Sequence, residues 1–575
     1  MKKLCRLLCI VAGLSTAHWA AAAQERAVGQ WNGQIETPVG KLTLLVNIRE
    51  SANAGFSGDL ESIDQAPGQK IPLAAVAATP AKLTFEIPSI GASYDGSWQE
   101  AQHAWVGVFK QGIAFPLSLR AGDPPARPGV AGMDGQWRGT LLRDNARLRL
   151  ILHFATGQGG TRATLDSPDL GAFGLAVERL ERNGNTVQFE VPAANVIFNG
   201  KLNDTQQQLQ GRWTRQGLPP ATVMFVHDAV EAKPQARSQL PLKPAAYRSE
   251  ELRFPNPAAA DVVLAATLTL PEGPGPFPAS ILITGSGPQD RDETIYGHKP
   301  FAVLADALTR RGIAVLRCDD RGYAESSGNF DQATSADFAS DANAAVAYLM
   351  HRPEIDHHAI GFIGHSEGGM VGPIAAADNP SVAFVVMLAG PGTGLERVLL
   401  SQHREAAHAQ GATPAHAAKT EAIFGDIFHI VRTATKRQDG ANRLNQLLTP
   451  ETMRVLGLND VQRAQLVLRM NSAWMHYLLN YQPAATLAMV QVPVLALNGT
   501  LDRQVPVTEN LAGLRAALAG NPDATILELP GLNHMFQPAV TGAMGEYAQI
   551  EETFAPQAMD IIANWVLGRF SRVAQ

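Results

Sequence analysis

The stretch Ala359-Ile-Gly-Phe-Ile-Gly-His-Ser-Glu-Gly-Gly369 decides the fold of the second half of this chain. An apolar run typical of a buried strand leads into a tight Gly-His-Ser-Glu-Gly turn, and a helix-compatible run follows. This order is typical of a nucleophile elbow, in which the serine has strained backbone angles. Side chains two residues before and after the serine would clash across the turn, and Gly364 and Gly368 occupy both positions. The pattern predicts an exposed Ser366 hydroxyl, with the N–H of Glu367 beside it to stabilise an oxyanion.

The motif gains its weight from its context. In a chain of this length and composition, roughly 0.2 Gly-x-Ser-x-Gly matches are expected by chance. This is the only match in the sequence, and it lies where a predicted strand meets a predicted helix. The alternative is a glycine-rich strand-to-helix turn without chemistry. Asp502 and His534, the predicted catalytic partners of Ser366 later in the chain, argue against that alternative.

Length and charge set the domain number and exclude some partners. With 575 residues the chain is too long for one hydrophobic core, so two to four domains are expected. A net charge of −6 gives no reason to expect nucleic acid or anionic lipid as a partner.

Residues 1–23 are predicted to be a secretory signal peptide, because a basic start precedes an apolar stretch and a run of small residues. No later window has about eighteen uninterrupted apolar residues, so no stable membrane insertion is expected. After cleavage Cys318 is the single remaining cysteine, which excludes an internal disulfide and a cysteine-built metal site. The predicted location is periplasmic or secreted.

An internal repeat precedes the catalytic half. Gly29-Gln-Trp-Asn-Gly33 recurs as Gly135-Gln-Trp-Arg-Gly139, and four further matches follow in the same order at offsets of 104 to 105 residues. Residues 27–121 and 133–228 are therefore predicted to be two copies of one module. The further matches are Leu60–Asp64 with Leu165–Asp169, Leu83–Pro88 with Val187–Pro192, Tyr94–Gly96 with Phe198–Gly200, and Lys110–Gly112 with Arg215–Gly217.

Each copy is predicted to be antiparallel β structure, as a sandwich or small barrel, because short runs alternate apolar and polar residues between turn formers. Neither copy contains a Ser/His/acid or His-rich constellation. Trp31 and Trp137 are expected to anchor the two cores, and stacking on a sugar or other ligand is the alternative. Residues 229–244 are predicted to be a linker.

From residue 245 the pattern changes to strands alternating with helices, which is typical of a mostly parallel sheet covered on both faces. Ligands in such sheets bind beyond the carboxyl ends of the strands. The first two strands are expected to pair antiparallel. The predicted strands are residues 248–254, 262–270, 279–284, 312–317, 359–363, 382–388, 492–497 and 524–529, with helices that include 302–311 and 336–351.

Four motifs of residues 245–575 carry a resemblance to a known family. The chain resembles the α/β-hydrolase superfamily, in the serine aminopeptidase-like branch that also holds many esterases. The resemblance implies a mostly parallel eight-stranded sheet with a helical cap, and a catalytic order of serine, acid, histidine. The repeated β-modules are not part of the general family pattern. The motifs are Gly364–Gly369, Thr284–Asp292, Asp319–Gly328, and the pair Asn498–Val505 and Leu529–His534.

Asp502 and His534 are the predicted catalytic partners of Ser366. A serine hydroxyl needs an adjacent base that is oriented by a carboxylate. Both residues follow predicted strands through glycine-containing turns, so both are expected at the carboxyl edge of the sheet. The alternatives are a turn-capping role for Asp502 and a surface location for His534. Asp523 precedes a strand and is expected at the opposite edge, and His365 is expected in packing or substrate contact.

The second oxyanion donor is expected from the loop after the third strand, where Gly285-Ser-Gly287 replaces the more usual His-Gly of the family. The N–H of Ser286 is favoured, and that of Gly287 is the alternative. A phosphate-binding interpretation is weaker because no lysine follows at P-loop spacing. The Asp320-Arg-Gly322 segment is expected to brace the neighbouring loop through an ion pair.

Residues 391–487 separate the sixth and seventh predicted strands, where this superfamily places its cap. This segment is rich in Ala, Leu, His, Arg and Gln at helical spacing, so it is predicted to be helical. A cap excludes water and shapes the substrate pocket. Trp474, Met475, Tyr477 and Tyr481 are candidates to line that pocket, and packing inside the cap is the alternative.

The predicted reaction is hydrolysis of a small ester or acyl substrate through an acyl-enzyme, without a metal or cofactor. One alternative is a serine aminopeptidase, whose pocket would need acids such as Glu367, Glu325 or residues 290–293 to bind the substrate ammonium. A thioesterase is another, although export argues against it. From a different class comes a glycan- or envelope-binding protein with a vestigial hydrolase domain. Nothing in the sequence indicates an oligomeric state.

Overall fold

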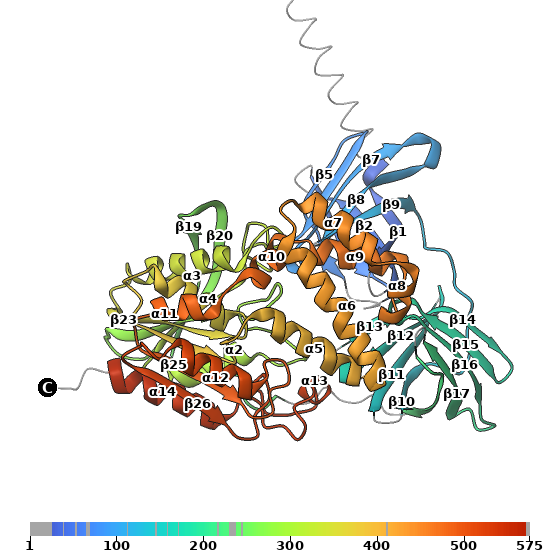
Figure 1. Ribbon diagram of the computed structural model, residues 1–575. Coiled ribbons are helices and arrows are strands. Elements are labelled where there is room, and N and C mark those ends of the chain that lie inside the picture. Colours follow the sequence, from blue (N-terminus) through green and yellow to red (C-terminus); the bar gives the residue numbers. More distant parts are fainter. Residues whose placement is uncertain are drawn as a thin grey trace, which may run out of the picture. The chain divides into compact units, whose positions relative to one another are not determined.

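The computed structural model describes most of the chain as two compact units (Figure 1). One unit holds most of the chain up to residue 231, and the other holds the chain from residue 232. The predicted signal peptide, residues 1–23, lies outside the described residues, as does most of the predicted linker. The described residues are 26–570, apart from 38–39, 52–54, 65–69, 112, 144–145, 158, 171, 216–217, 229–236, 243–244, 246 and 410–411.

The first repeat forms one antiparallel sheet with the strand order β4-β3-β2-β1-β9-β8-β7-β6-β5. Its edge strands, β4 and β5, are separated in the chain by Leu73 alone, so the sheet must curl until its two edges approach each other. The strands are β1 (Gly29–Thr37), β2 (Gly40–Glu50), β3 (Phe56–Ser62), β4 (Ile71–Pro72), β5 (Ala74–Ala78), β6 (Lys82–Ile87), β7 (Ala92–Gln99), β8 (Ala104–Gln111) and β9 (Ile113–Ala121).

The second repeat has the same architecture, with the order β13-β12-β11-β10-β18-β17-β16-β15-β14. Here Val177 alone separates the two edge strands. The prediction of two repeated antiparallel β-modules is confirmed. The strands are β10 (Gly135–Arg143), β11 (Ala146–Gly157), β12 (Gly160–Ser167), β13 (Ala172–Ala176), β14 (Glu178–Asn183), β15 (Thr186–Val191), β16 (Val196–Leu202), β17 (Gln208–Arg215) and β18 (Ala221–Asp228).

The duplication extends to side-chain contacts inside the two sheets. Trp31 and Trp137 are 4% and 0% exposed, so they are core anchors and present no face for a ligand to stack on. Each indole N–H donates to a carbonyl four residues earlier, at 2.9 Å and 2.7 Å. Matched stacked ring pairs, Phe85–Tyr94 and Phe189–Phe198, have centroids 5.1 Å and 4.7 Å apart.

The second unit is built on one eight-stranded sheet with the order β19-β20-β22-β21-β23-β24-β25-β26. β20 pairs antiparallel with β19 and β22, and the pairs from β22 onward are parallel. This order, with its antiparallel start, is that of the α/β-hydrolase fold, as predicted. The strands are β19 (Arg248–Asn256), β20 (Ala259–Leu270), β21 (Phe277–Ile283), β22 (Ala314–Cys318), β23 (Ile355–His365), β24 (Phe384–Leu388), β25 (Val494–Gly499) and β26 (Ala524–Leu529).

Helices cover both faces of this sheet (Figure 1). Neighbouring residues of a strand point to opposite faces, so Phe362 packs in the core under one helical layer and Ile363 in the core under the other. One layer contains α3 (Ser335–Leu349), α4 (Gly368–Ala377) and α12 (Val507–Ala517), and the other contains α2 (Pro300–Thr309) and α14 (Pro556–Phe570).

A helical cap lies in the chain between β24 and β25, as predicted. Its apolar residues form a core of their own, which includes Phe428 and Met475 and also contacts Met370 of α4. Among the described residues, no helix combines the length and apolarity needed to cross a membrane. The helices from α5 onward are α5 (Leu395–Ala409), α6 (Pro414–Thr433), α7 (Arg437–Leu447), α8 (Pro450–Leu456), α9 (Asp460–Met470), α10 (Ala473–Asn480) and α11 (Pro483–Met489), with α13 (Met544–Tyr547) later in the chain.

Candidate active site

Ser366 lies in a strained turn between β23 and α4. Its φ is +53°, in the left-handed region that serine rarely occupies. The backbone N–H of Ser366 donates to Leu388 O at 2.8 Å, which fixes the turn against the neighbouring strand. A Cβ on Gly364 would overlap Gly368 O, and one on Gly368 would overlap Ile283 O. The elbow therefore has the geometry predicted from its two glycines.

Alanine in place of Gly368 is expected to lower the free energy of unfolding by about 1–3 kcal/mol, because the new methyl group meets rigid backbone of β21. Gly372, one turn later in α4, is the matched control. A Cβ there would lie 3.5 Å from Phe362 Cβ, an ordinary contact, so Gly372→Ala should be neutral or stabilise by up to about 1 kcal/mol through helix propensity. Urea unfolding of both variants measures the difference. Equal stabilities would contradict the close packing of the elbow.

His534 and Asp502 form a buried hydrogen-bonded pair. His534 Nδ1 lies 2.8 Å from Asp502 Oδ2, and the residues are 3% and 6% exposed. Asp502 Oδ1 accepts the backbone N–H groups of Gln504 and Val505 at 2.8 Å and 2.9 Å. An ionised carboxylate at this place makes Nδ1 the protonated nitrogen and leaves Nε2 free to accept a proton.

The same pair lies beside the elbow. The ring of His534 is 4.8 Å from the ring of His365, the residue before Ser366. Asp523, the rival acid, forms an ion pair with Arg569 at 2.7 Å, and its carbonyl receives the N–H of Val494 at the start of β25. The structure thus brings Asp502 and His534 to the carboxyl edge of the sheet and leaves Asp523 at the other edge.

The Gly285-Ser-Gly287 loop abuts the nucleophile. A Cβ built on Gly285 would lie 3.4 Å from Ser366 Cβ. The N–H of Gly285 donates to Glu293 Oε1 at 2.9 Å, so this group is not available to a substrate. The next two N–H groups, those of Ser286 and Gly287, are the two alternatives that the sequence offered for the second oxyanion donor.

Asp320 accepts hydrogen bonds from residues on both sides of this loop. Its carboxyl accepts the hydroxyl of Thr284 at 2.7 Å and the N–H of Gln289 at 2.8 Å. Burial raises the pKa of Asp320 well above its usual value, and these hydrogen bonds oppose that rise. The expected ion pair does not brace this loop. Arg321 pairs instead with Asp341 of α3 at 2.6 Å, and Asp320 holds the loop through hydrogen bonds.

Glu367 joins the elbow to the cap through its side chain. Its Oε1 accepts the hydroxyl of Ser335 at 2.6 Å and the indole N–H of Trp474 at 2.8 Å. Burial raises the pKa of Glu367, and hydrogen bonds from Ser335, Trp474 and Ser286 oppose that rise. Trp474, an expected pocket residue, therefore contacts the residue that follows the nucleophile.

The other expected pocket residues of the cap are placed differently. Tyr477 is half-buried, and its ring is stacked at 6.3 Å from that of Tyr481. Met475 and Tyr481 are buried at 3% and 8% exposure in the core of the cap, in agreement with the alternative of packing.

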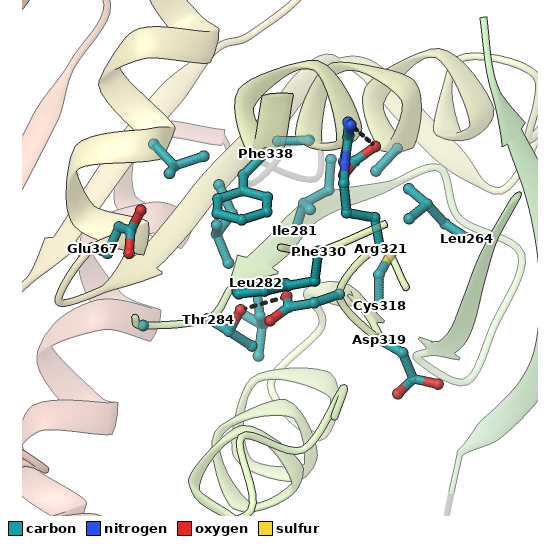
Figure 2. A pocket seen from close by; sticks show the side chains of 17 residues that line it. Leu264, Ile281, Leu282, Thr284, Cys318, Asp319, Arg321, Phe330, Phe338 and Glu367 are labelled. Carbon is teal, nitrogen blue, oxygen red and sulfur yellow. Dashed lines mark hydrogen bonds and ion pairs between the residues drawn. The ribbon is translucent and has the colours of Figure 1, made fainter. Parts of the chain in front are cut away.

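A cavity of about 50 Å³ lies inside the α/β domain (Figure 2). This volume holds one or two water molecules, whereas sites for small ligands typically enclose several hundred Å³. The cavity is therefore too small to be an acyl pocket. Its lining includes Leu264, Ile281, Thr284, Cys318, Phe338 and Glu367.

The sequence analysis named Glu293 only as one of several acids that could bind a substrate ammonium, and it missed the role that the structure gives this residue. Glu293, 2% exposed and with a φ of +52°, contacts both the Gly285 N–H and His365. It stands one residue beyond the quoted Thr284–Asp292 motif, and no spacing rule links it to a histidine 72 positions later.

Among the described residues, no group of three or more His, Cys, Asp or Glu side chains is arranged to hold a metal ion.

Comparisons with known proteins match the catalytic half. The model of the X-Pro dipeptidyl-peptidase (S15) family matches residues 260–528. Esterase EstD of Thermotoga maritima is 28% identical over 272 residues, which are 47% of this chain and 58% of that protein. The chain thus spans less than two thirds of the length of this curated relative.

Two solved structures of esterases are also similar in part. Est1E of Butyrivibrio proteoclasticus with bound ferulic acid is 16% identical, with a TM-score of 0.34 over 56% of this chain and 100% of that one. Esterase Pf2001 of Pyrococcus furiosus is 14% identical, with a TM-score of 0.34 over 56% of this chain and 93% of that one.

The strand order of the sheet and the elbow at Ser366 agree with the two sequence matches. The second half of this chain has the α/β-hydrolase fold, and its sequence is similar to the esterase- and peptidase-like branch of that superfamily.

Proposed function

We propose that this protein is an exported serine hydrolase that cleaves carboxylic esters through an acyl-enzyme. The observation that carries the proposal is the buried His534–Asp502 pair beside the strained Ser366 turn. The pattern of residues 1–23 supports export to the periplasm or the exterior.

The geometry suits acyl transfer to water. Ser366 Oγ attacks the ester carbonyl while His534 Nε2 takes its proton, and Asp502 stabilises the imidazolium that forms. The N–H of Glu367 and that of Ser286 or Gly287 hold the oxyanion. His534 then returns the proton to the leaving alcohol. A water molecule next attacks the acyl-enzyme carbonyl while His534 takes its proton, and the return of that proton to Ser366 Oγ releases the acid.

Ester cleavage is favoured over aminopeptidase activity because the acids that would bind a substrate ammonium are already engaged. Glu367 accepts from Ser335 and Trp474, and Glu293 accepts from Gly285. An ammonium at Oε1 of Glu367 or of Glu293 would have to displace these donors, whereas Oε2 of Glu367 is buried without a hydrogen-bond partner among the described residues and is the oxygen that an aminopeptidase could still use. The remaining candidates are also engaged: Asp290 accepts from Thr294, Asp292 pairs with Lys299 and Arg317, and Glu325 pairs with Arg291 and Arg253.

A peptidase is the second candidate, and the match to the S15 family model is the observation in its favour. Initial rates on nitrophenyl esters of increasing chain length, beside aminoacyl and X-Pro nitroanilides, distinguish the two. The expected result is ester turnover with little anilide cleavage.

A fluorophosphonate probe adds a readout that does not depend on the chosen substrate. We expect one adduct per chain, on the peptide that contains Ser366. Preferential anilide cleavage with the same adduct would make the protein a peptidase. Absence of both turnover and adduct would instead favour a binding role for the β-modules.

A further inference from the structure

Both ring nitrogens of His365 face groups that accept hydrogen bonds. Nδ1 lies 2.8 Å from Glu293 Oε1, and Nε2 lies 3.0 Å from the backbone carbonyl oxygen of His534. His365 is 6% exposed and Glu293 is 2% exposed, so water does not take the place of either partner. This arrangement lies directly before the nucleophile and is not used by the proposed reaction.

The two contacts fix the number of protons that the pair holds. A carbonyl oxygen only accepts, so Nε2 must be protonated. The contact between Nδ1 and Oε1 needs a second proton between nitrogen and oxygen, because two lone pairs would otherwise face each other. His365 and Glu293 therefore share two protons, as an imidazolium beside a carboxylate.

Electrostatics agree with this assignment. Burial is the largest single effect and lowers the pKa of His365, but the charge and hydrogen bond of Glu293, the His534 carbonyl and the charge of Asp502 together raise it by more. The net pKa lies above the usual histidine value. The titratable groups that face His365 are thus Glu293, Asp502 and His534. The charge of Glu293 also raises the pKa of Asp320.

The pair connects the two parts of the active site that must be aligned with Ser366. Glu293 Oε1 holds the N–H of Gly285 in the oxyanion loop, and His365 Nε2 holds the backbone of His534. We propose that His365 and Glu293 form a doubly protonated positioning dyad that sets the base and the oxyanion loop relative to the nucleophile. The proposal rests on the proposed serine-hydrolase function.

The dyad predicts an alkaline limit to activity. Its second proton is present below the raised pKa of His365 and is lost as the pH rises through that pKa. Loss of this proton leaves an unprotonated ring nitrogen facing either Glu293 or the His534 carbonyl. One of the two hydrogen bonds of His365 is then broken, and the base or the oxyanion loop is no longer held in position. kcat should fall above this pKa with little change in KM, since the proposed dyad acts on the base and the oxyanion loop rather than on the substrate.

Glu293→Gln tests the limit. The amide has the size of the carboxylate and can still accept from Gly285, but it removes the charge that raises the pKa of His365. We expect kcat to fall about tenfold at neutral pH, and the alkaline limb of kcat to move down by about one pH unit or more. Glu509→Gln is the matched control, because Glu509 of α12 is an exposed ion-pair partner of Arg397 and its loss should leave the pH profile unchanged.

Histidine ¹⁵N NMR of the Ser366→Ala protein reads the protonation state without any turnover. Both ring nitrogens of His365, assigned with an additional His365→Gln change, should be protonated at neutral pH. A neutral His365 there, or an unshifted alkaline limb in a folded Glu293→Gln variant, would overturn the dyad. If wild-type protein cleaves no ester, the proposed function fails, while the NMR result still decides the protonation of the pair.

Discussion

Ser366→Ala should lower kcat for ester substrates by about 10⁴- to 10⁶-fold, the range found when the nucleophile of a serine hydrolase is removed. The fold should be kept. Serine already bears the cost of a φ of +53°, and the backbone bonds to Leu388 O and from Gly369 N do not involve the side chain. The free energy of unfolding is therefore expected to change by no more than about 1 kcal/mol.

Ser249→Ala is the matched control, since this serine is exposed on β19 at the far end of the sheet order. It should keep wild-type kcat and wild-type labelling by the fluorophosphonate probe. Turnover within tenfold of wild type in Ser366→Ala, with the enzyme shown free of contaminating esterase, would mean that the nucleophile is another residue.

Much of the catalytic half could be predicted because its signals are local. Gly364 and Gly368 are required by a turn of a few residues, so the elbow can be recognised without knowledge of the rest of the fold. The buried strands are short apolar runs, and observed β24 and β26 end at the predicted residues, Leu388 and Leu529. The two tryptophans could be assigned to cores because both copies of the module repeat the same pattern.

The pairing of polar residues could not be predicted, because the fold decides which distant groups meet. Asp320 faces Thr284 because β21 lies beside β22 in the sheet, and Arg321 faces Asp341 because α3 packs on one side. Sequence spacing carries neither fact. Glu293 and His365 meet across 72 residues, and the neighbouring acids Asp290 and Asp292 are equally plausible partners of His365 from the sequence alone.

The second large effect is expected from Asp502→Asn, which should lower kcat by about 10⁴-fold. The structure dictates how the amide must sit. Its oxygen has to replace Oδ1, which accepts the N–H groups of Gln504 and Val505, so its NH₂ group replaces Oδ2 and points at His534 Nδ1. His534 is then held with the proton on Nε2, and that nitrogen can no longer accept the proton of Ser366.

The same substitution puts the new NH₂ group against the Nδ2 group of Asn498, which donates to Oδ2 at 3.1 Å in the native protein. One buried donor then loses its acceptor, so a loss of about 1–3 kcal/mol in the free energy of unfolding is expected beside the loss of kcat. Asp523→Asn is the control: it breaks an exposed pair with Arg569 and should leave kcat unchanged and stability within about 1 kcal/mol. If Asp502→Asn kept kcat within tenfold of wild type while Asp523→Asn did not, the acid of the triad would have to be sought at the opposite edge of the sheet.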